Sequence, residues 1–264
     1  MYQSFYTGAL GAGSCMARMG VIANNLANIN NDGFKPKTAA FSDLLNYNLN
    51  DSEGAVTELM AGNGVRMQRT YTGYGTGAIV QTTSDCDFAI MEDNAFFMVQ
   101  DPATGEITYT RSGNFHKGQM EDGYYLTTAN GKLVLDQNGE PLKVDVADVD
   151  EMQAEMDEDY EPEEVDEDEE DEEEDEDKPR LSVYTFSNPS WLMSVGDNEY
   201  AAPAGMEPQL VENPRIVSSA LERSGTDLSK EMVRVIECQR AYSYALKMVT
   251  TSDEIESTIN SLRG

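Results

Sequence analysis

The chain is poor in the side chains on which most enzyme and metal sites depend. Its 264 residues include one histidine, His116, and three widely spaced cysteines, Cys15, Cys86 and Cys238. There is no CxxC pair, and an odd number of cysteines cannot form a complete disulfide set. We therefore expect no metal, no cofactor and no redox role, with small buried or half-buried cysteines and His116 in a loop-like stretch.

Long apolar runs and basic residues are also scarce. No stretch reaches the roughly 18 apolar residues of a membrane-spanning helix, and residues 1–5 lack the features of a secretory signal. We therefore expect a cytoplasmic protein, or one exported without a cleaved signal peptide. Only 18 Lys and Arg oppose 49 Asp and Glu, which gives a net charge of −31. Such a chain repels phosphate backbones and anionic membranes, so neither is an expected partner.

Most of this charge lies in one segment, 145–177, which holds 23 acidic residues and no basic ones. Like charges at that density repel, and the few apolar residues cannot offset the entropy of ordering. We predict a disordered acidic insert. A calcium loop is the alternative, but no glycine interrupts the run as such a loop requires.

The N-terminal stretch predicts an amphipathic helix that ends near Asn28, before the turn residues 30–33 and Pro36. Four internal glycines, at about 1 kcal/mol each relative to alanine, predict a helix that orders fully only when packed. Its apolar residues alternate at spacings of four and three, as in the seam of a coiled coil. The predicted seam residues are Phe5, Ala9, Ala12, Met16, Met19, Ala23 and Leu26.

The C-terminal stretch repeats the same spacing over some 35 residues, which would make a helix of roughly 50 Å. A single amphipathic helix usually forms one wall of its own domain. Here the seams lie at both chain ends with no helical pattern between them, so each helix is the obvious partner of the other. The predicted seam residues are Leu228, Met232, Val235, Tyr242, Leu246, Val249, Ile255, Ile259 and Leu262.

The middle of the chain predicts short antiparallel strands. From about residue 65 to 144, brief apolar runs alternate with turn residues, and Asn130-Gly131 and Asn138-Gly139 are hairpin signals. Residues 181–186 should add one more strand after the insert. The predicted fold class is α+β, with long terminal helices around a central antiparallel β domain. The expected domains are helical (1–35 and 225–264), β-rich (36–144 and 178–224) and the acidic insert (145–177).

Several short motifs occur in a fixed order along the chain. The first is Asn24-Asn25-Leu26-Ala27-Asn28 followed by Gly33-Phe34-Lys35, in which the asparagines can bond backbone groups at a helix end and glycine supplies a turn conformation. Later motifs are Asp87-Phe88-Ala89-Ile90, Tyr109-Thr110-Arg111, Leu221-Glu222 and Gln239-Arg240-Ala241-Tyr242.

Together these motifs resemble those of the flagellar rod and hook proteins, across residues 1–144 and 181–264. Departures include Asn31 where the family usually has Thr, and Gly225-Thr226 where it has Asn-Val. The resemblance implies a structural subunit of the basal-body rod that polymerises helically through its terminal helices, transmits torque and leaves the cell through the flagellar type III export apparatus. The implied partners are other copies, other rod and hook proteins and the export apparatus. Length and motifs are most like those of distal rod members, with proximal rod and hook-type members as alternatives.

Two functions of other classes compete with this interpretation. An enzyme would need a polar cluster, for which Asp87, Glu92, Asp93 and Arg111 are the candidates, but the sequence has no activated nucleophile, phosphate loop or usable histidine. An acidic export-associated binding module would explain the insert but would leave the helical seams without a role. We therefore expect a protein that is not an enzyme.

Overall fold

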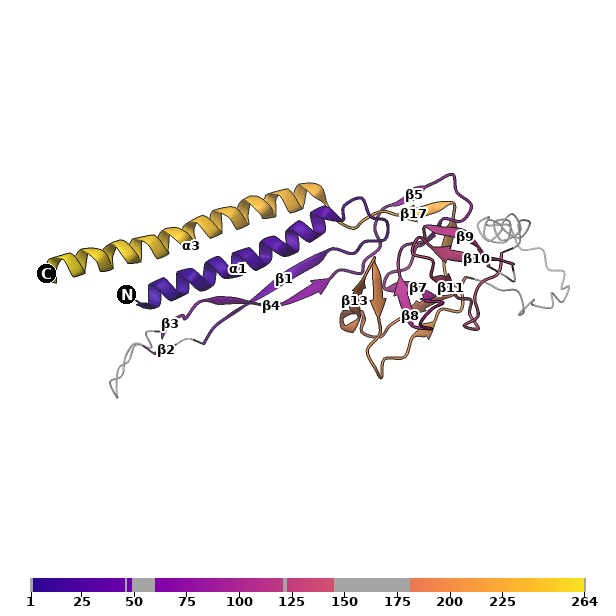
Figure 1. The fold of residues 1–264 in the computed structure, drawn as a ribbon, viewed down its shortest axis with the longest axis horizontal. Coiled ribbons are helices and arrows are strands. Elements are labelled where there is room, and N and C mark those ends of the chain that lie inside the picture. Colours follow the sequence, from indigo (N-terminus) through magenta and orange to yellow (C-terminus); the bar gives the residue numbers. More distant parts are fainter. Residues whose placement is uncertain (1, 46, 49–59, 121–122, 145–180, 264) are drawn as a thin grey trace, which may run out of the picture. The chain divides into compact units, whose positions relative to one another are not determined.

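The computed structural model describes residues 2–45, 47–48, 60–120, 123–144 and 181–263 (Figure 1). The predicted acidic insert, 145–177, lies outside these residues. The chain divides into two compact units. We call Met1–Ile29, Pro36–Gly73 and Thr226–Gly264 the helical unit, and Asn30–Lys35 and Tyr74–Gly225 the sheet unit.

The helical unit contains both terminal helices, α1 (Tyr2–Ala27) and α3 (Leu228–Arg263). They run antiparallel side by side, with both chain ends at the same end of the unit (Figure 1). The predicted end of the first helix near Asn28 and the long C-terminal helix are confirmed. The start of α3 is capped by Asp227, whose Oδ1 accepts hydrogen bonds from the backbone N–H groups of Ser229 (2.9 Å) and Lys230 (3.2 Å).

A β ribbon also belongs to the helical unit. Strand β1 (Lys37–Asp43) pairs antiparallel with β4 (Val65–Thr72), with a bulge between Ala40 and Phe41. Between them lies the short pair β2 (Tyr47–Asn48) and β3 (Met60–Ala61). Residues 36–73 therefore group with the helices, whereas the sequence pattern assigned them to the β-rich domain. The Ser14 hydroxyl on α1 donates to Val65 O at 2.8 Å, which ties the ribbon to the helix.

The sheet unit is built mainly on a nine-stranded antiparallel sheet, counted among the described residues. Its main path runs β13-β14-β8-β7-β11-β10-β9, while β12 pairs with β7 and β15. Two further pairs, β16 with β6 and β17 with β5, complete the strands. The bounds are β5 (Ile79–Gln81), β6 (Phe88–Ile90), β7 (Ala95–Gln100), β8 (Ile107–Thr110), β9 (Phe115–Met120), β10 (Gly123–Thr128), β11 (Leu133–Val134), β12 (Val183–Thr185), β13 (Met193–Gly196), β14 (Glu199–Ala201), β15 (Gln209–Leu210), β16 (Ile216–Ser218) and β17 (Ala220–Glu222), with a 3₁₀ turn η2 at Pro189–Trp191.

Strand β7 lies at the centre of this unit and is buried on both faces. Phe97 and Val99 belong to one apolar cluster, and Phe96 and Met98 to another. This explains why β7 is a continuous apolar run rather than an alternating one, because a strand covered on both sides needs apolar residues at every position. The sheet therefore separates two apolar clusters, one on each face of β7.

The hairpin predictions are confirmed and one loop prediction is wrong. Gly131, at φ +79°, follows β10, and its N–H donates to Thr128 O at 2.9 Å, while Gly139 makes the equivalent turn at φ +81°. The predicted strand after the insert is β12. His116, expected in a loop, lies in strand β9 opposite Thr127. Because His116 is exposed on a strand at the edge of the sheet, the residues around it lack the alternating apolar pattern that identifies a strand in a sequence.

Candidate functional site

Small residues form the contact between the two terminal helices. The Ser4 and Ser252 hydroxyls lie 3.1 Å apart, and the Cys238 thiol donates to Cys15 O at 3.0 Å. A Cβ placed on Gly8 would lie 3.0 Å from Val249 Cγ2 and 3.2 Å from Ala245 O, so the two backbones approach closely. This contact uses the face of α1 that carries Ser4, Gly8, Gly11 and Cys15.

The predicted seam of α1 is offset from that face by one residue. Ala12 is buried and Met19 and Leu26 are half-buried, but Phe5, Ala9, Met16 and Ala23 are exposed, with Met16 at 67%. The sequence pattern weighted large apolar residues, whereas close helix packing selected small ones. The predicted seam residues of α1 thus lie between the face that contacts α3 and the solvent-exposed face of the helix. Its role in assembly stays a prediction.

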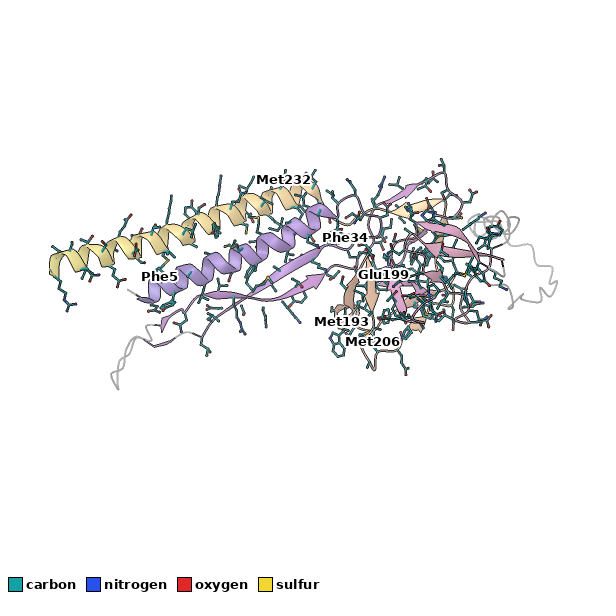
Figure 2. The ribbon with its side chains drawn as sticks, viewed as in Figure 1. Phe5, Phe34, Met193, Glu199, Met206 and Met232 are labelled. Carbon is teal, nitrogen blue, oxygen red and sulfur yellow. The ribbon has the colours of Figure 1, made fainter. Side chains whose placement is uncertain are left out.

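Helix α3 shows the same offset. Val235, Tyr242 and Val249 of the predicted seam are half-buried, while the positions buried most deeply on α3 are Glu231, Cys238 and Ser252. Figure 2 shows Phe5 near the start of α1 and Met232 near the start of α3, and both side chains are more than a third exposed. The predicted seam residues that remain exposed on α3 are Leu228, Met232, Leu246, Ile255, Ile259 and Leu262.

The last turns of α3 extend past the start of α1. Ser4, two residues after the start of α1, contacts Ser252, so the last turns of α3, which ends at Arg263, lie beyond the beginning of the helix pair (Figure 1). This overhang carries Ile255, Ile259 and Leu262 at spacings of four and three, and Leu262 is 82% exposed. It is an apolar stripe at one end of the helical unit.

The asparagine motif at the end of α1 is a local structural device. Asn25 is buried, and its side chain makes a reciprocal pair with Lys37: Nδ2 donates to Lys37 O at 2.7 Å, and Lys37 N donates to Oδ1 at 2.9 Å. Asn28 Nδ2 donates to Asn24 O at 2.8 Å. Within the same motif Leu26 is half-buried and Ala27 is exposed.

The second half of this motif, Gly33-Phe34-Lys35, supplies Lys35 to a buried charge cluster in the sheet unit. Lys35 Nζ lies 2.5 Å from Glu222 Oε1, and Arg111 Nε lies 2.8 Å from Glu222 Oε2. All three side chains are no more than 1% exposed. Burial, together with the nearby Arg111 guanidinium, lowers the pKa of Lys35. We call Lys35, Arg111 and Glu222 the charge triad.

Backbone carbonyls and a threonine complete the bonding of the triad. Lys35 Nζ donates to Gly75 O (2.8 Å), and Arg111 donates from Nη1 to Ala95 O (2.8 Å) and from Nη2 to Thr76 Oγ1 (3.0 Å). The triad was not predicted as a cluster. Its only sequence signal is a glutamate in an otherwise apolar strand, β17, together with two cations that lie inside motifs far away in the chain.

The remaining motif residues have structural positions or are exposed. Asp87 is buried beside Asn114, Tyr109 packs edge-on against Phe186 with 4.8 Å between ring centroids, and Thr110 Oγ1 donates to Asn198 O. On α3, Gln239, Arg240 and Ala241 are exposed and Tyr242 is half-buried.

The residues proposed for the enzyme alternative do not form a reactive cluster. Arg111 is occupied by Glu222, and Asp93 Oδ1 accepts hydrogen bonds from the Thr76 N–H and hydroxyl, which lower its pKa. Glu92 accepts from the Arg215 N–H at 3.3 Å. Among the described residues no group of three His, Cys, Asp or Glu side chains is placed to hold a metal ion. No helix within the described ranges is long and apolar enough to cross a membrane.

Comparison with known proteins gives matches over both units. Residues 217–262 match the family model "Flagellar basal body rod FlgEFG protein C-terminal", and residues 90–168 match "Flagellar hook protein FlgE/F/G D1 domain". The flagellar basal-body rod protein FlgG of Buchnera aphidicola subsp. Baizongia pistaciae is 29% identical, with 97% of each chain covered. FlgG of Bacillus subtilis is 28% identical and the flagellar hook-basal body complex protein FlhP of the same organism 24%, each with full coverage of both chains.

The two family models and the full-length similarity to FlgG proteins agree with the order of the motifs on α1, the sheet unit and α3. Over its whole length the chain is similar to flagellar basal-body rod and hook proteins, with greater identity to the two FlgG proteins than to FlhP.

Proposed function

We propose that this chain is a structural subunit of the flagellar basal-body rod that polymerises helically through α1 and α3. The observation that carries the proposal is the set of exposed apolar side chains on these helices, from Phe5 and Met16 on α1 to Leu246 and Leu262 on α3. Exposed apolar patches of this extent mark interaction surfaces in soluble proteins.

The arrangement of these side chains favours an open polymer over a closed dimer. The exposed side of α1 and the overhang of α3 are different surfaces, so a contact between them in two copies is heterologous. Repetition of one heterologous contact that does not close into a ring produces a filament. The overhang supports this view, because its apolar stripe extends past the start of α1 and has room for a neighbouring copy.

The wider role follows from the relatives rather than from the fold alone. Several similar proteins carry the name flagellar basal-body rod protein, and we assign this chain to the same structure, in contact with other rod and hook proteins. Export through the flagellar type III apparatus and transmission of torque are part of the proposal. The family is a structural one, and we assign no catalytic role to the chain.

The test is sedimentation velocity of the full chain over a range of concentrations. We expect the wild-type protein to associate, and Met16→Asp and Leu246→Asp to prevent association, since each places a charge on an apolar contact surface. Both side chains are exposed in the single chain, so the variants should keep the wild-type circular dichroism spectrum of the monomer. Thr70→Asp, a charge of the same sign at an exposed position of β4, is the control and should associate normally. Normal association of the two helix variants would contradict the proposal.

A further inference from the structure

The charge triad lies where the chain enters and leaves the sheet unit. Segment 30–35, which lies between α1 and β1 and ends with Lys35, and segment 222–225, which begins with Glu222, both belong to the sheet unit and both border the helical unit in the chain. We call these two segments the connectors. The chain also passes between the units at Gly73 and Tyr74, outside the connectors. Whatever holds the connectors fixes the path of the chain at the other places where it passes between the units.

Backbone hydrogen bonds join the two connectors to each other. The Gly33 N–H donates to Glu222 O at 2.7 Å, and the Gly225 N–H donates to Phe34 O at 3.0 Å. The side chains of Arg223 and Asp32 add an exposed ion pair at 3.3 Å, which contributes little because water screens it. Each connector also has a bond to the rest of the sheet unit: Asn198 Nδ2 donates to Asp32 O at 3.1 Å, and the Arg223 N–H donates to Ala78 O at 2.8 Å.

The Glu222 carboxylate then binds the joined connectors to the sheet. One oxygen accepts from Lys35 Nζ on connector 30–35 and from the Gly77 N–H, and the other accepts from Arg111 Nε after β8. Arg111 in turn donates to carbonyls at the end of β6 and at the start of β7. One carboxylate therefore links both connectors to the central strands.

At this cluster the backbones of the connectors and of the rest of the sheet unit lie too close together for a side chain to fit between them. A Cβ on Gly33 would lie 2.6 Å from the backbone of Arg111, and a Cβ on Gly77 would lie 2.5 Å from Arg223 O. Gly33 also has φ +69°, which other residues adopt at a cost. Side chains are therefore excluded at both positions, and the backbones are in direct contact there.

We propose that the charge triad is a latch that holds the two connectors to the sheet, and that it opens locally, without unfolding of the sheet. Removing Glu222 leaves two buried cations without their carboxylate, which is a large penalty. Lys35 can escape that penalty by moving into water with its connector, which also uncovers Arg111, whereas β7 keeps its own apolar contacts on both faces. If the chain is a rod subunit, as proposed above, a closed latch lets load pass through both connectors at once.

The experiment is hydrogen exchange, read by mass spectrometry, on the dilute full-length chain. In Glu222→Gln we expect exchange in peptides covering 30–35 and 220–226 to rise by on the order of 100-fold, while β7 keeps its wild-type protection. Trypsin should also cleave faster after Arg223. Glu199→Gln is the matched control, because Glu199 is a buried carboxylate whose own partners, Lys132 and Thr108, belong to neither connector. It should leave connector exchange unchanged.

Equal increases in the connectors and in β7 would overturn the proposal, since the triad would then stabilise the unit only as a whole. Unchanged connector exchange would overturn it as well. Should Glu222→Gln fail to fold, Lys35→Met, which leaves the Arg111–Glu222 pair in place, should give a smaller increase confined to the connectors. The measurement reads a single chain, so its failure would leave the assembly proposal untouched.

Discussion

The contact between α1 and α3 can be tested by placing the same side chain on two faces of one helix. Valine at Gly8 would meet Val249 Cγ2 and Ala245 O, whereas a Cβ on Gly13 has no atom within 4 Å. Both substitutions gain the same helix propensity, about 0.4 kcal/mol over glycine. The difference between the two variants therefore isolates the cost of forcing the helices apart.

Overpacking of a tight contact costs about 1–3 kcal/mol. A unit of about 100 residues changes its melting temperature by roughly 4–8 °C per kcal/mol. We therefore expect Gly8→Val to melt at least about 4 °C below Gly13→Val. The assay is thermal unfolding followed by circular dichroism at 222 nm, at a concentration where the chain is monomeric. Gly20→Val repeats the control, because a Cβ at Gly20 is also free of contacts.

Equal melting temperatures for the Gly8 and Gly13 variants would refute this reasoning. They would mean that α1 does not pack on α3 in the isolated chain. The four glycines of α1 would then indicate a helix that becomes ordered only when neighbouring copies pack against it. A wild-type chain that lacks protected amides over residues 4–28 would lead to the same conclusion.

Two further predictions concern single charged residues. The pKa of Lys35 is lowered in the folded chain, so between that lowered pKa and 10.5 the unfolded chain binds more protons than the folded chain. The contribution of Lys35 to stability therefore rises as the pH rises through this range and is lost as the pH falls through the lowered pKa. Urea unfolding at several pH values from 8 to 10.5 should therefore show a rise in wild-type stability relative to Lys35→Met, and a constant difference would contradict it. Asp227→Ala should increase amide exchange in the first turn of α3 at neutral pH; in the wild type the same increase should occur only in acid, because the Lys230 N–H lowers the pKa of Asp227. Wild-type exchange in the variant would show that the cap is unimportant.

Features set by neighbouring residues could be predicted from the sequence. The end of α1, the Gly131 and Gly139 turns and the apolar run of β7 all depend on residues within a few positions of each other, and each was found where expected. Strand β1 was missed. Its residues 37–43 include two alanines and few β-branched side chains, and its partner β4 lies more than twenty positions away.

The candidate site was harder to predict because it depends on distances between segments far apart in the chain. The offset of the helix seam depends on how closely two backbones approach, and that in turn depends on Gly8 and Ala245 together. Glu222 forms a triad with Lys35 and Arg111, which are 187 and 111 positions away. A motif shows that such residues matter, but only the fold shows that they share one carboxylate.

The motif residues divide into two groups, and the division bears on function. Asn25, Gly33, Lys35 and Arg111 are buried, and their contacts within one chain account for them. Gln239, Arg240 and Ala241 are exposed on α3, so packing in the single chain does not explain why these residue types occur there. Exposed motif residues on a helix that also carries exposed apolar side chains are what an interface between copies requires. The first group therefore builds the subunit, and we propose that the second group contacts neighbouring copies.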